Sequence, residues 1–131
     1  MSEKELCSYA IKAIENSYAP YSGFKVGAAL LTKTGKVYLG CNIENATFSP
    51  TNCAERTAFF KAISEGEKEF SAIAIAGGKD GIISDICSPC GVCRQVMAEF
   101  CSKDFVILLA KEDSSFEKYT LSQLLPLAFE L

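Results

Sequence analysis

Hydrophobic positions along the chain alternate between helical and strand-like spacing. The first periodic stretch, residues 3–18, has apolar side chains at i, i+4, i+7 and i+8, namely Leu6, Ala10, Ala13 and Ile14. This spacing places them on one side of a helix. Pro20 and Gly23 follow, and both residue types interrupt a helix. The pattern therefore predicts a helix over 3–18 and then a turn.

Further along, apolar runs rich in β-branched and aromatic residues predict strands. The predicted strands are 24–32, 36–44, 70–78, 104–110 and, more weakly, 116–120. Between and after them, helical spacing predicts a helix that follows the loop 45–50 and runs to about Ser64, a helix over 90–101, and a short helical piece over 121–131. Gly66 stands where a helix commonly ends.

The order of these elements predicts the fold class. Strand–helix–strand units imply parallel neighbours, whereas the closely spaced strands 24–32 and 36–44 form a hairpin and are antiparallel. We therefore expect a single domain over residues 1–131, of class α/β, with three α-β-α layers around a mixed sheet of about five strands. In such sheets the active crevice lies where strands end and helices begin.

Composition narrows the function. The chain has 131 residues, of which 49% are hydrophobic and 22% charged, and its net charge is -3. This is typical of a soluble globular protein and argues against a broad basic surface for nucleic acid. No apolar run reaches the length of about 20 residues that spans a membrane. The polar start, "MSEKELCSYA", lacks the features of a secretion signal, so we expect a cytoplasmic protein.

The chain has seven cysteines and no histidine. Without histidine, Ser–His and Cys–His catalytic pairs are excluded. In a reducing compartment, numerous cysteines indicate metal ligands, nucleophiles or small buried residues rather than disulfides. A tightly bound zinc ion would then depend mainly on thiolates.

Cys90 and Cys93 in "SPCGVCRQ" have the C-x-x-C spacing, which suits a redox dithiol or half of a zinc site. Adding Cys53, which stands at the start of another predicted helix, gives three thiolates and leaves one coordination position open. That arrangement is typical of catalytic zinc. Cys87 forms a second C-x-x-C with Cys90, so the spacing alone permits a rival set of ligands.

Glu55 follows Cys53 by two residues, at the start of the same predicted helix. An acidic residue in any first turn is favoured by the helix dipole. Beside a metal, however, a carboxylate that is not a ligand can take a proton from water and pass it to a substrate. We interpret Glu55 as such a general acid–base.

Two long segments, "CNIENATFSPTNCAERTAFFKAISEG" and "PCGVCRQV", together resemble the cytidine deaminase family in its short, homotetrameric, all-cysteine form. The resemblance extends from "YAPYSGFKVGAALLT" to "LLPLAF". It implies a cytidine deaminase-like fold and one Zn²⁺ per subunit. It also implies hydrolytic deamination of cytidine and 2′-deoxycytidine, a reaction of pyrimidine salvage, with the nucleoside as the small-molecule partner.

The resemblance also assigns roles around the metal. Cys53, Cys90 and Cys93 correspond to the zinc ligands, and Glu55 to the proton shuttle. Arg56 corresponds to an arginine that donates hydrogen bonds to the cysteine sulfurs. Only Cys90 follows the Pro of the family motif, so Cys87 is interpreted as a loop thiol, and the other cysteines, Cys7, Cys41 and Cys101, as buried hydrophobic residues.

The remaining assignments concern the substrate. In the family, residues matching Asn42 and Glu44 bind the ribose 3′-hydroxyl, and alternation along a strand makes both point the same way. Phe24 and Ala54 match residues of the substrate pocket. Phe129 matches a phenylalanine that reaches the site of a neighbouring subunit and stacks on the base, although this sequence ends two residues later.

Two other functions fit parts of the pattern. One is a zinc deaminase that acts on a modified cytosine nucleoside, such as an aminoacylated antibiotic; the ribose-binding pair argues against it. The other is a non-enzymatic zinc module, which would need a fourth protein ligand, with Cys87 as the nearby candidate.

Overall fold

The computed structural model describes all residues from 1 to 131. Its helices are α1 (Glu3–Ala13), α2 (Ala54–Ser64), α3 (Gly91–Phe100) and α4 (Leu121–Leu124), and a 3₁₀ turn, η1 (Ile14–Asn16), extends α1. The strands are β1 (Phe24–Thr32), β2 (Val37–Cys41), β3 (Phe70–Lys79), β4 (Val106–Ala110) and β5 (Phe116–Thr120). None of the helices has the length and apolar character needed to cross a membrane.

The strands form one mixed sheet in the order β2-β1-β3-β4-β5. β3 and β4 pair in parallel, because α3 crosses from the end of one to the start of the other. The other three pairs are antiparallel. This topology confirms the predicted α/β class with a five-stranded mixed sheet.

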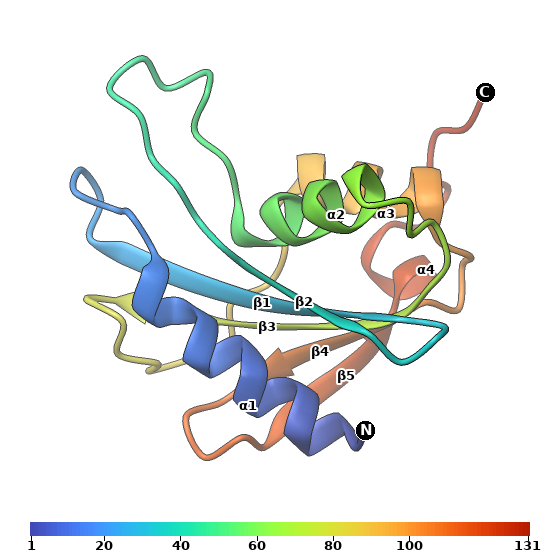
Figure 1. Ribbon diagram of the computed structural model, residues 1–131, viewed down its shortest axis with the longest axis horizontal. Coiled ribbons are helices and arrows are strands. Elements are labelled where there is room, and N and C mark those ends of the chain that lie inside the picture. Colours follow the sequence, from blue (N-terminus) through green and yellow to red (C-terminus); the bar gives the residue numbers. More distant parts are fainter.

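Helices cover both faces of the sheet. In Figure 1, α1 crosses one face, while α2 and α3 lie together on the other. Alternating side chains of β1 divide between the two cores: Ala29 packs under α1, whereas Ala28 and Leu30 pack under α2 and α3. The three-layer arrangement follows from burial of both faces of the central strands.

Two glycines allow the helices to approach the sheet closely. A Cβ atom at Gly27 of β1 would collide with the backbone of α1 at Ala10 and would lie 2.7 Å from the nitrogen of Ile14. A Cβ atom at Gly40 of β2 would collide with Ala54 and would lie 2.6 Å from the nitrogen of Ala58. Gly27 therefore lies under the last turns of α1, and Gly40 under the first turn of α2.

Three predicted elements end earlier than expected. The helix predicted over 3–18 gives way to η1 and ends at Asn16, and the strand predicted over 36–44 ends at Cys41, since Ile43 pairs with Asn52 instead. The helix predicted over 121–131 ends at Leu124. Proline at 126 disfavours helical geometry for the preceding residue, and Leu125 has φ -140° and ψ 70°.

Candidate active site

Three cysteine sulfurs meet where α2 and α3 begin. Cys53 is the N-cap residue of α2, Cys90 that of α3, and Cys93 lies in the first turn of α3. The sulfur of Cys90 lies 3.7 Å from that of Cys53 and 3.6 Å from that of Cys93. All three sulfurs lie within 4.8 Å of one another, and Cys87 is not part of this group.

The spacing of the sulfurs fits zinc. Four ligands at about 2.3 Å in a tetrahedron place neighbouring sulfurs about 3.8 Å apart, close to the two distances observed here. The donor set also fits, because thiolates are preferred zinc ligands and three of them leave one position open for water or substrate. The rival set that includes Cys87 is not assembled, so the three predicted ligands are the ones that the fold brings together.

The cluster favours the thiolate form of Cys53. A hydrogen bond from the Cys93 thiol lowers the pKa of Cys53, and Arg56 adds to this effect against the influence of burial. The same thiol pair raises the pKa of Cys93. Both helices also direct the positive end of their dipole at the sulfurs of their N-cap residues. A metal therefore meets at least one thiol that is already prepared to lose its proton.

Arg56 lies against this cluster from the first turn of α2. Its Nη2 donates a hydrogen bond to the sulfur of Cys53 over 3.3 Å, as the sequence predicts for this residue. Its Nε is buried and has no hydrogen-bond partner. Because a cation in the first turn opposes the helix dipole, the contact with the Cys53 sulfur is what makes this position favourable.

Glu55 stands between Cys53 and Arg56 in the chain, and its side chain is only 4% exposed. Burial raises the pKa of Glu55 to about 7, and negative charge on Cys53 raises it as well. A carboxyl group with a pKa near neutrality can both take up and release a proton at physiological pH. A buried carboxyl of this pKa, two residues from one of the clustered cysteines, has the properties of a general acid–base.

Asn42 and Glu44 both turn toward residues 17–26. The Asn42 amide donates to the Phe24 carbonyl over 2.7 Å, and its oxygen accepts from the backbone N–H of Val26 over 2.9 Å and from the Ser17 hydroxyl. Glu44 accepts from the backbone N–H groups of residues 21 and 22, at 2.9 and 3.1 Å, and from the hydroxyl of residue 22. Each side chain therefore ties the segment before α2 to β1 or to the turn that precedes it.

The Ile43–Asn52 bridge brings this segment to the metal site. Its two backbone hydrogen bonds are each 2.9 Å long, and they place the residue after Asn42 beside the residue before Cys53. Phe24, at the start of β1, is 42% exposed, so it is not part of the closed core. Together these contacts assemble one end of the sheet around the start of α2.

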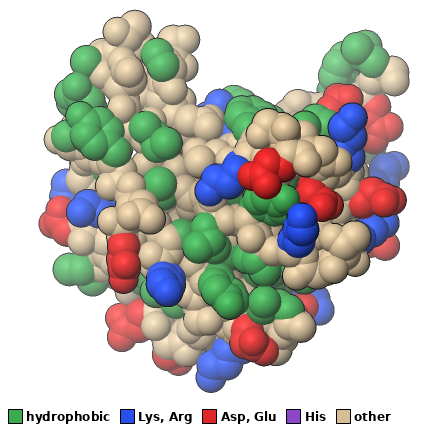
Figure 2. All heavy atoms as spheres, in the orientation of Figure 1, with side chains coloured by type: hydrophobic (Ala, Val, Ile, Leu, Met, Phe, Trp, Pro, Cys, Tyr) green, Lys and Arg blue, Asp and Glu red, His purple; other side chains and the backbone are tan.

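Phe129 lies outside this assembly in its own chain. Its side chain is 69% exposed, and its carbonyl accepts a hydrogen bond from Gln95 on α3. Figure 2 shows hydrophobic side chains on two projections, one at the upper left and one at the upper right; Figure 1 identifies them as the loop before α2 and the C-terminal segment. In the first of these, Phe48 is 79% exposed.

Sequence reasoning missed Arg94, which follows the predicted zinc ligand Cys93. Its Nε donates to the carbonyl of Pro89 over 2.8 Å, and its Nη1 donates to the carbonyl of Leu124. These bonds connect the residue before Cys90 with the end of α4. The sequence did contain a signal for Arg94, since a cation near the start of a helix opposes the helix dipole and needs a local hydrogen-bond acceptor.

Known proteins match the chain over most of its length. The profile of the family described as "Cytidine and deoxycytidylate deaminase zinc-binding region" matches residues 1–109. The cytidine deaminase of Sporosarcina psychrophila is 49% identical over 129 residues, which are 98% of this chain and 92% of the relative. That of Halalkalibacterium halodurans is also 49% identical over 129 residues, 98% of this chain and 95% of the relative.

A solved structure also matches the chain over most of its length. The 1.6 Å crystal structure of cytidine deaminase from Burkholderia pseudomallei is 44% identical to this chain and superposes with a TM-score of 0.90. The superposition covers 98% of this chain and 100% of the other.

Proposed function

Since the match extends over residues 1–109, the chain belongs to the cytidine and deoxycytidylate deaminase zinc-binding family, and we propose that it hydrolyses the exocyclic amine of cytidine and 2′-deoxycytidine. The products are uridine or 2′-deoxyuridine and ammonia, a reaction of pyrimidine salvage. Residues 1–131 then act as a single zinc-dependent deaminase domain. Relatives named cytidine deaminase at 49% identity support this substrate class.

The observation that carries the proposal is the pairing of a buried carboxyl with an open three-thiolate site. Cys53, Cys90 and Cys93 would hold one Zn²⁺, and Glu55 lies buried within two residues of the first of them. A structural zinc site closes with a fourth protein ligand. A site with only three thiolates and a carboxyl of raised pKa instead suits hydrolysis.

When bound, zinc lowers the pKa of water from about 15.7 toward about 7, which supplies hydroxide at neutral pH. Glu55 accepts the proton released from that water and donates it to N3 of the cytosine ring, which makes C4 more electrophilic. After the oxygen has added to C4, Glu55 transfers the remaining hydroxyl proton to the exocyclic nitrogen, and the C4–N bond breaks to release ammonia. One carboxyl thus moves both protons.

Unused hydrogen-bonding capacity near this site supports the roles proposed for Asn42, Glu44 and Ala54. The Asn42 amide uses one of its two N–H groups on Phe24, so one remains for a ribose oxygen. The Glu44 carboxylate accepts three hydrogen bonds and has room for one from the 3′-hydroxyl. Ala54 is fully buried, with its side chain in the core under α2. It is the first residue of α2, where backbone N–H groups lack a partner in the helix, and we assign that N–H to the base.

In this proposal, residues from more than one chain enclose the cytosine base. We infer a homotetramer in which Phe129 stacks on the base bound to a neighbouring subunit, while Phe24 lines the pocket from within. The 69% exposure of Phe129 supports this role, because an aromatic ring at the surface is available to a partner. Seven free cysteines support a cytoplasmic location, since the thiolate ligands must remain reduced.

Ammonia release tests the proposed function directly. Zinc-loaded protein should release one ammonia for each cytidine or 2′-deoxycytidine consumed, and removal of the metal with a chelator should abolish the release. Zinc-replete protein that leaves both nucleosides unchanged would contradict the proposal. Sedimentation of the same preparation should show a species of four chains, and an active monomer would contradict the shared site.

A further inference from the structure

The last six residues, 126–131, are held to the protein by one hydrogen bond. Nε2 of Gln95 on α3 donates to the carbonyl of Phe129 over 2.9 Å, and no other hydrogen bond or ion pair involves this segment. Leu127 and Leu131 are fully exposed. Packing of apolar side chains therefore contributes little to fixing the path of the segment.

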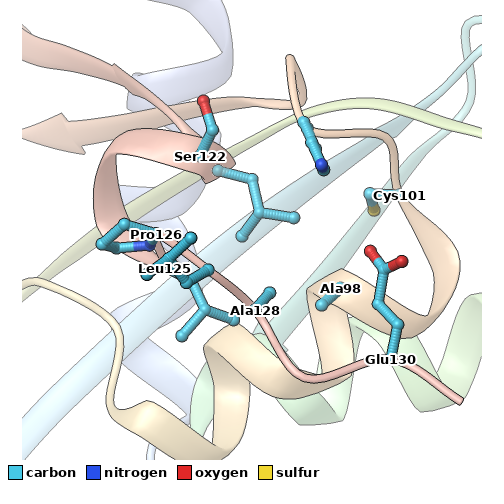
Figure 3. A pocket seen from close by; sticks show the side chains of 10 residues that line it. Ala98, Cys101, Ser122, Leu125, Pro126, Ala128 and Glu130 are labelled. Carbon is cyan, nitrogen blue, oxygen red and sulfur yellow. The ribbon is translucent and has the colours of Figure 1, made fainter.

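A hollow lies beside the segment rather than a packed interface. It has a volume of about 570 Å³, and Ala98, Cys101, Leu121 and Leu125 are among the residues that line it. Figure 3 shows Ala128 and Glu130 on the chain that passes Ala98 of α3, with Leu125 and Pro126 on the opposite side of the hollow. Because the segment borders open space, the hydrogen bond from Gln95 is what sets its position.

The near end of the segment is fixed by the residue before Gln95. Nη1 of Arg94 donates to the carbonyl of Leu124, and its Nε donates to that of Pro89, the residue before the ligand Cys90. Arg94 and Gln95 directly follow the ligand Cys93. One turn of α3 thus carries the predicted zinc ligand Cys93 and forms hydrogen bonds to the end of α4 and to the backbone of Phe129.

We propose that Gln95 is a positioning residue for Phe129, and that Arg94 fixes the chain from which this segment starts. The turn of α3 that supplies a metal ligand then also sets where the aromatic ring is presented to the neighbouring subunit. The effect on catalysis rests on the proposed function, in which that ring stacks on the bound nucleoside. Gln95 itself does not touch the substrate and acts through the backbone of Phe129.

The test replaces the Gln95 side-chain amide, which donates the hydrogen bond, by a carboxylate of the same shape, which can only accept one. Gln95→Glu places a carboxylate against the Phe129 carbonyl, so the hydrogen bond is lost and the segment moves away. We expect the KM for cytidine to rise about five- to tenfold, the effect of one lost hydrogen bond, with kcat changed less than twofold and zinc content unchanged. Glu99→Gln, on the same helix beside Phe129 but without a bond to it, is the matched control and should behave like the wild type.

A double-mutant cycle separates positioning from a general structural effect. In a Phe129→Ala background, Gln95→Glu should raise the KM no further, because the ring that it positions is gone. A wild-type KM for Gln95→Glu overturns the proposal, and so does an equal rise in both backgrounds.

A second readout does not depend on activity. The chain has no tryptophan, so Phe129→Trp introduces a single fluorescent reporter at the proposed position. Adding Gln95→Glu should lower its fluorescence anisotropy, whereas Glu99→Gln should not; equal anisotropy in all three proteins overturns the positioning role. If the wild type releases no ammonia, the proposed function fails, and the anisotropy still decides whether Gln95 holds Phe129.

Discussion

The two faces of the sheet each bear a helix that packs over a glycine, yet only one face carries chemistry. Under α1, Gly27 contacts the last turns of the helix, and the core there consists of aliphatic side chains and Cys7. Under α2, Gly40 contacts the first turn, which is where Cys53 and Glu55 lie. The main difference between the faces is therefore which end of the helix lies closest to the sheet: the C-terminal end of α1 on one face and the N-terminal end of α2 on the other.

This difference explains how cysteine has two roles in one small protein. Cys7 is fully buried in the middle of α1, where burial raises the pKa of its thiol to about 11 and keeps it protonated. Cys53 caps a helix at the edge of the core, where hydrogen bonds and the helix dipole favour the thiolate. A thiol at a helix start is therefore suited to bind a metal, whereas a thiol in a helix centre is a packing residue.

The strongest test of the α2 face is Glu55→Gln. The amide keeps the shape of the carboxyl group but cannot transfer protons, so we expect turnover to fall by at least about 10³-fold with zinc retained. Turnover and bound zinc should be measured on the same preparation. Glu69→Gln, an exposed change before β3, serves as the control and should leave turnover unchanged. A zinc-replete Glu55→Gln variant that turns over near the wild-type rate would exclude Glu55 as the proton shuttle.

The substitutions Gly27→Ala and Gly40→Ala compare the two faces of the sheet directly. Either substitution forces a Cβ atom into helix backbone, so both should lower the free energy of unfolding by about 1–3 kcal/mol. Only Gly40→Ala displaces the turn that carries Glu55, and a shift of about 1 Å can reduce turnover about 10²-fold. Gly27→Ala should change turnover per folded, zinc-loaded molecule less than twofold. Equal losses of turnover in both variants would show that the helix end in contact with the sheet is not decisive.

Local spacing predicted the helices and strands, and the family resemblance pointed to the three cysteines that the fold brings together. The helical period of α1, the alternation of β1 and the repeated cysteines at helix starts are visible within short windows. One predicted end was wrong because a partner outside the strand decides it. The strand that contains Cys41 ends early because Ile43 pairs with Asn52, and periodicity carries no information about that bridge.

Hydrogen bonds between side chains and partners far apart in the sequence could not be predicted either. Asn42 and Glu44 were predicted to point the same way, and in the structure both turn toward residues 17–26; the ribose roles assigned to them stay a prediction. Arg94 and Gln95 were part of the quoted "CGVCRQ" motif, but their acceptors, Leu124 and Phe129, lie about 30 residues further along. Such pairs follow from the packing of α3 against the end of the chain.

Removing the positive charge beside the cluster should have a smaller effect than removing the shuttle. Arg56→Gln loses the hydrogen bond to the sulfur of Cys53, and charge-assisted bonds of this kind contribute about 1.5–3 kcal/mol. We expect zinc to be retained and turnover to fall about tenfold or somewhat more. The acidic limb of the pH–rate profile should move to higher pH, because loss of a nearby cation favours the protonated form of acidic groups. At equal zinc content, an unchanged limb and an unchanged maximal rate would rule out this electrostatic role.

The smallest expected effect concerns Cys7 on the α1 face. The folded state raises the pKa of this thiol from 9.0 to about 11, so between these values the unfolded chain holds fewer protons than the folded one. The contribution of the Cys7 thiol to the free energy of unfolding is therefore fully present below about pH 9. It is lost as the pH rises toward 11, by about 1.4 kcal/mol per pH unit for one thiol. Below pH 9, Cys7→Ala should lower the free energy of unfolding because it leaves a cavity, and at higher pH it should lack this part of the alkaline slope, so the difference from the wild type should shrink. Denaturant unfolding of both proteins between pH 9 and 10.5, with the exposed Ser8→Ala as control, measures the difference. Equal slopes would mean that the Cys7 thiol ionises alike in the folded and unfolded chain, and that burial under α1 does not hold its proton.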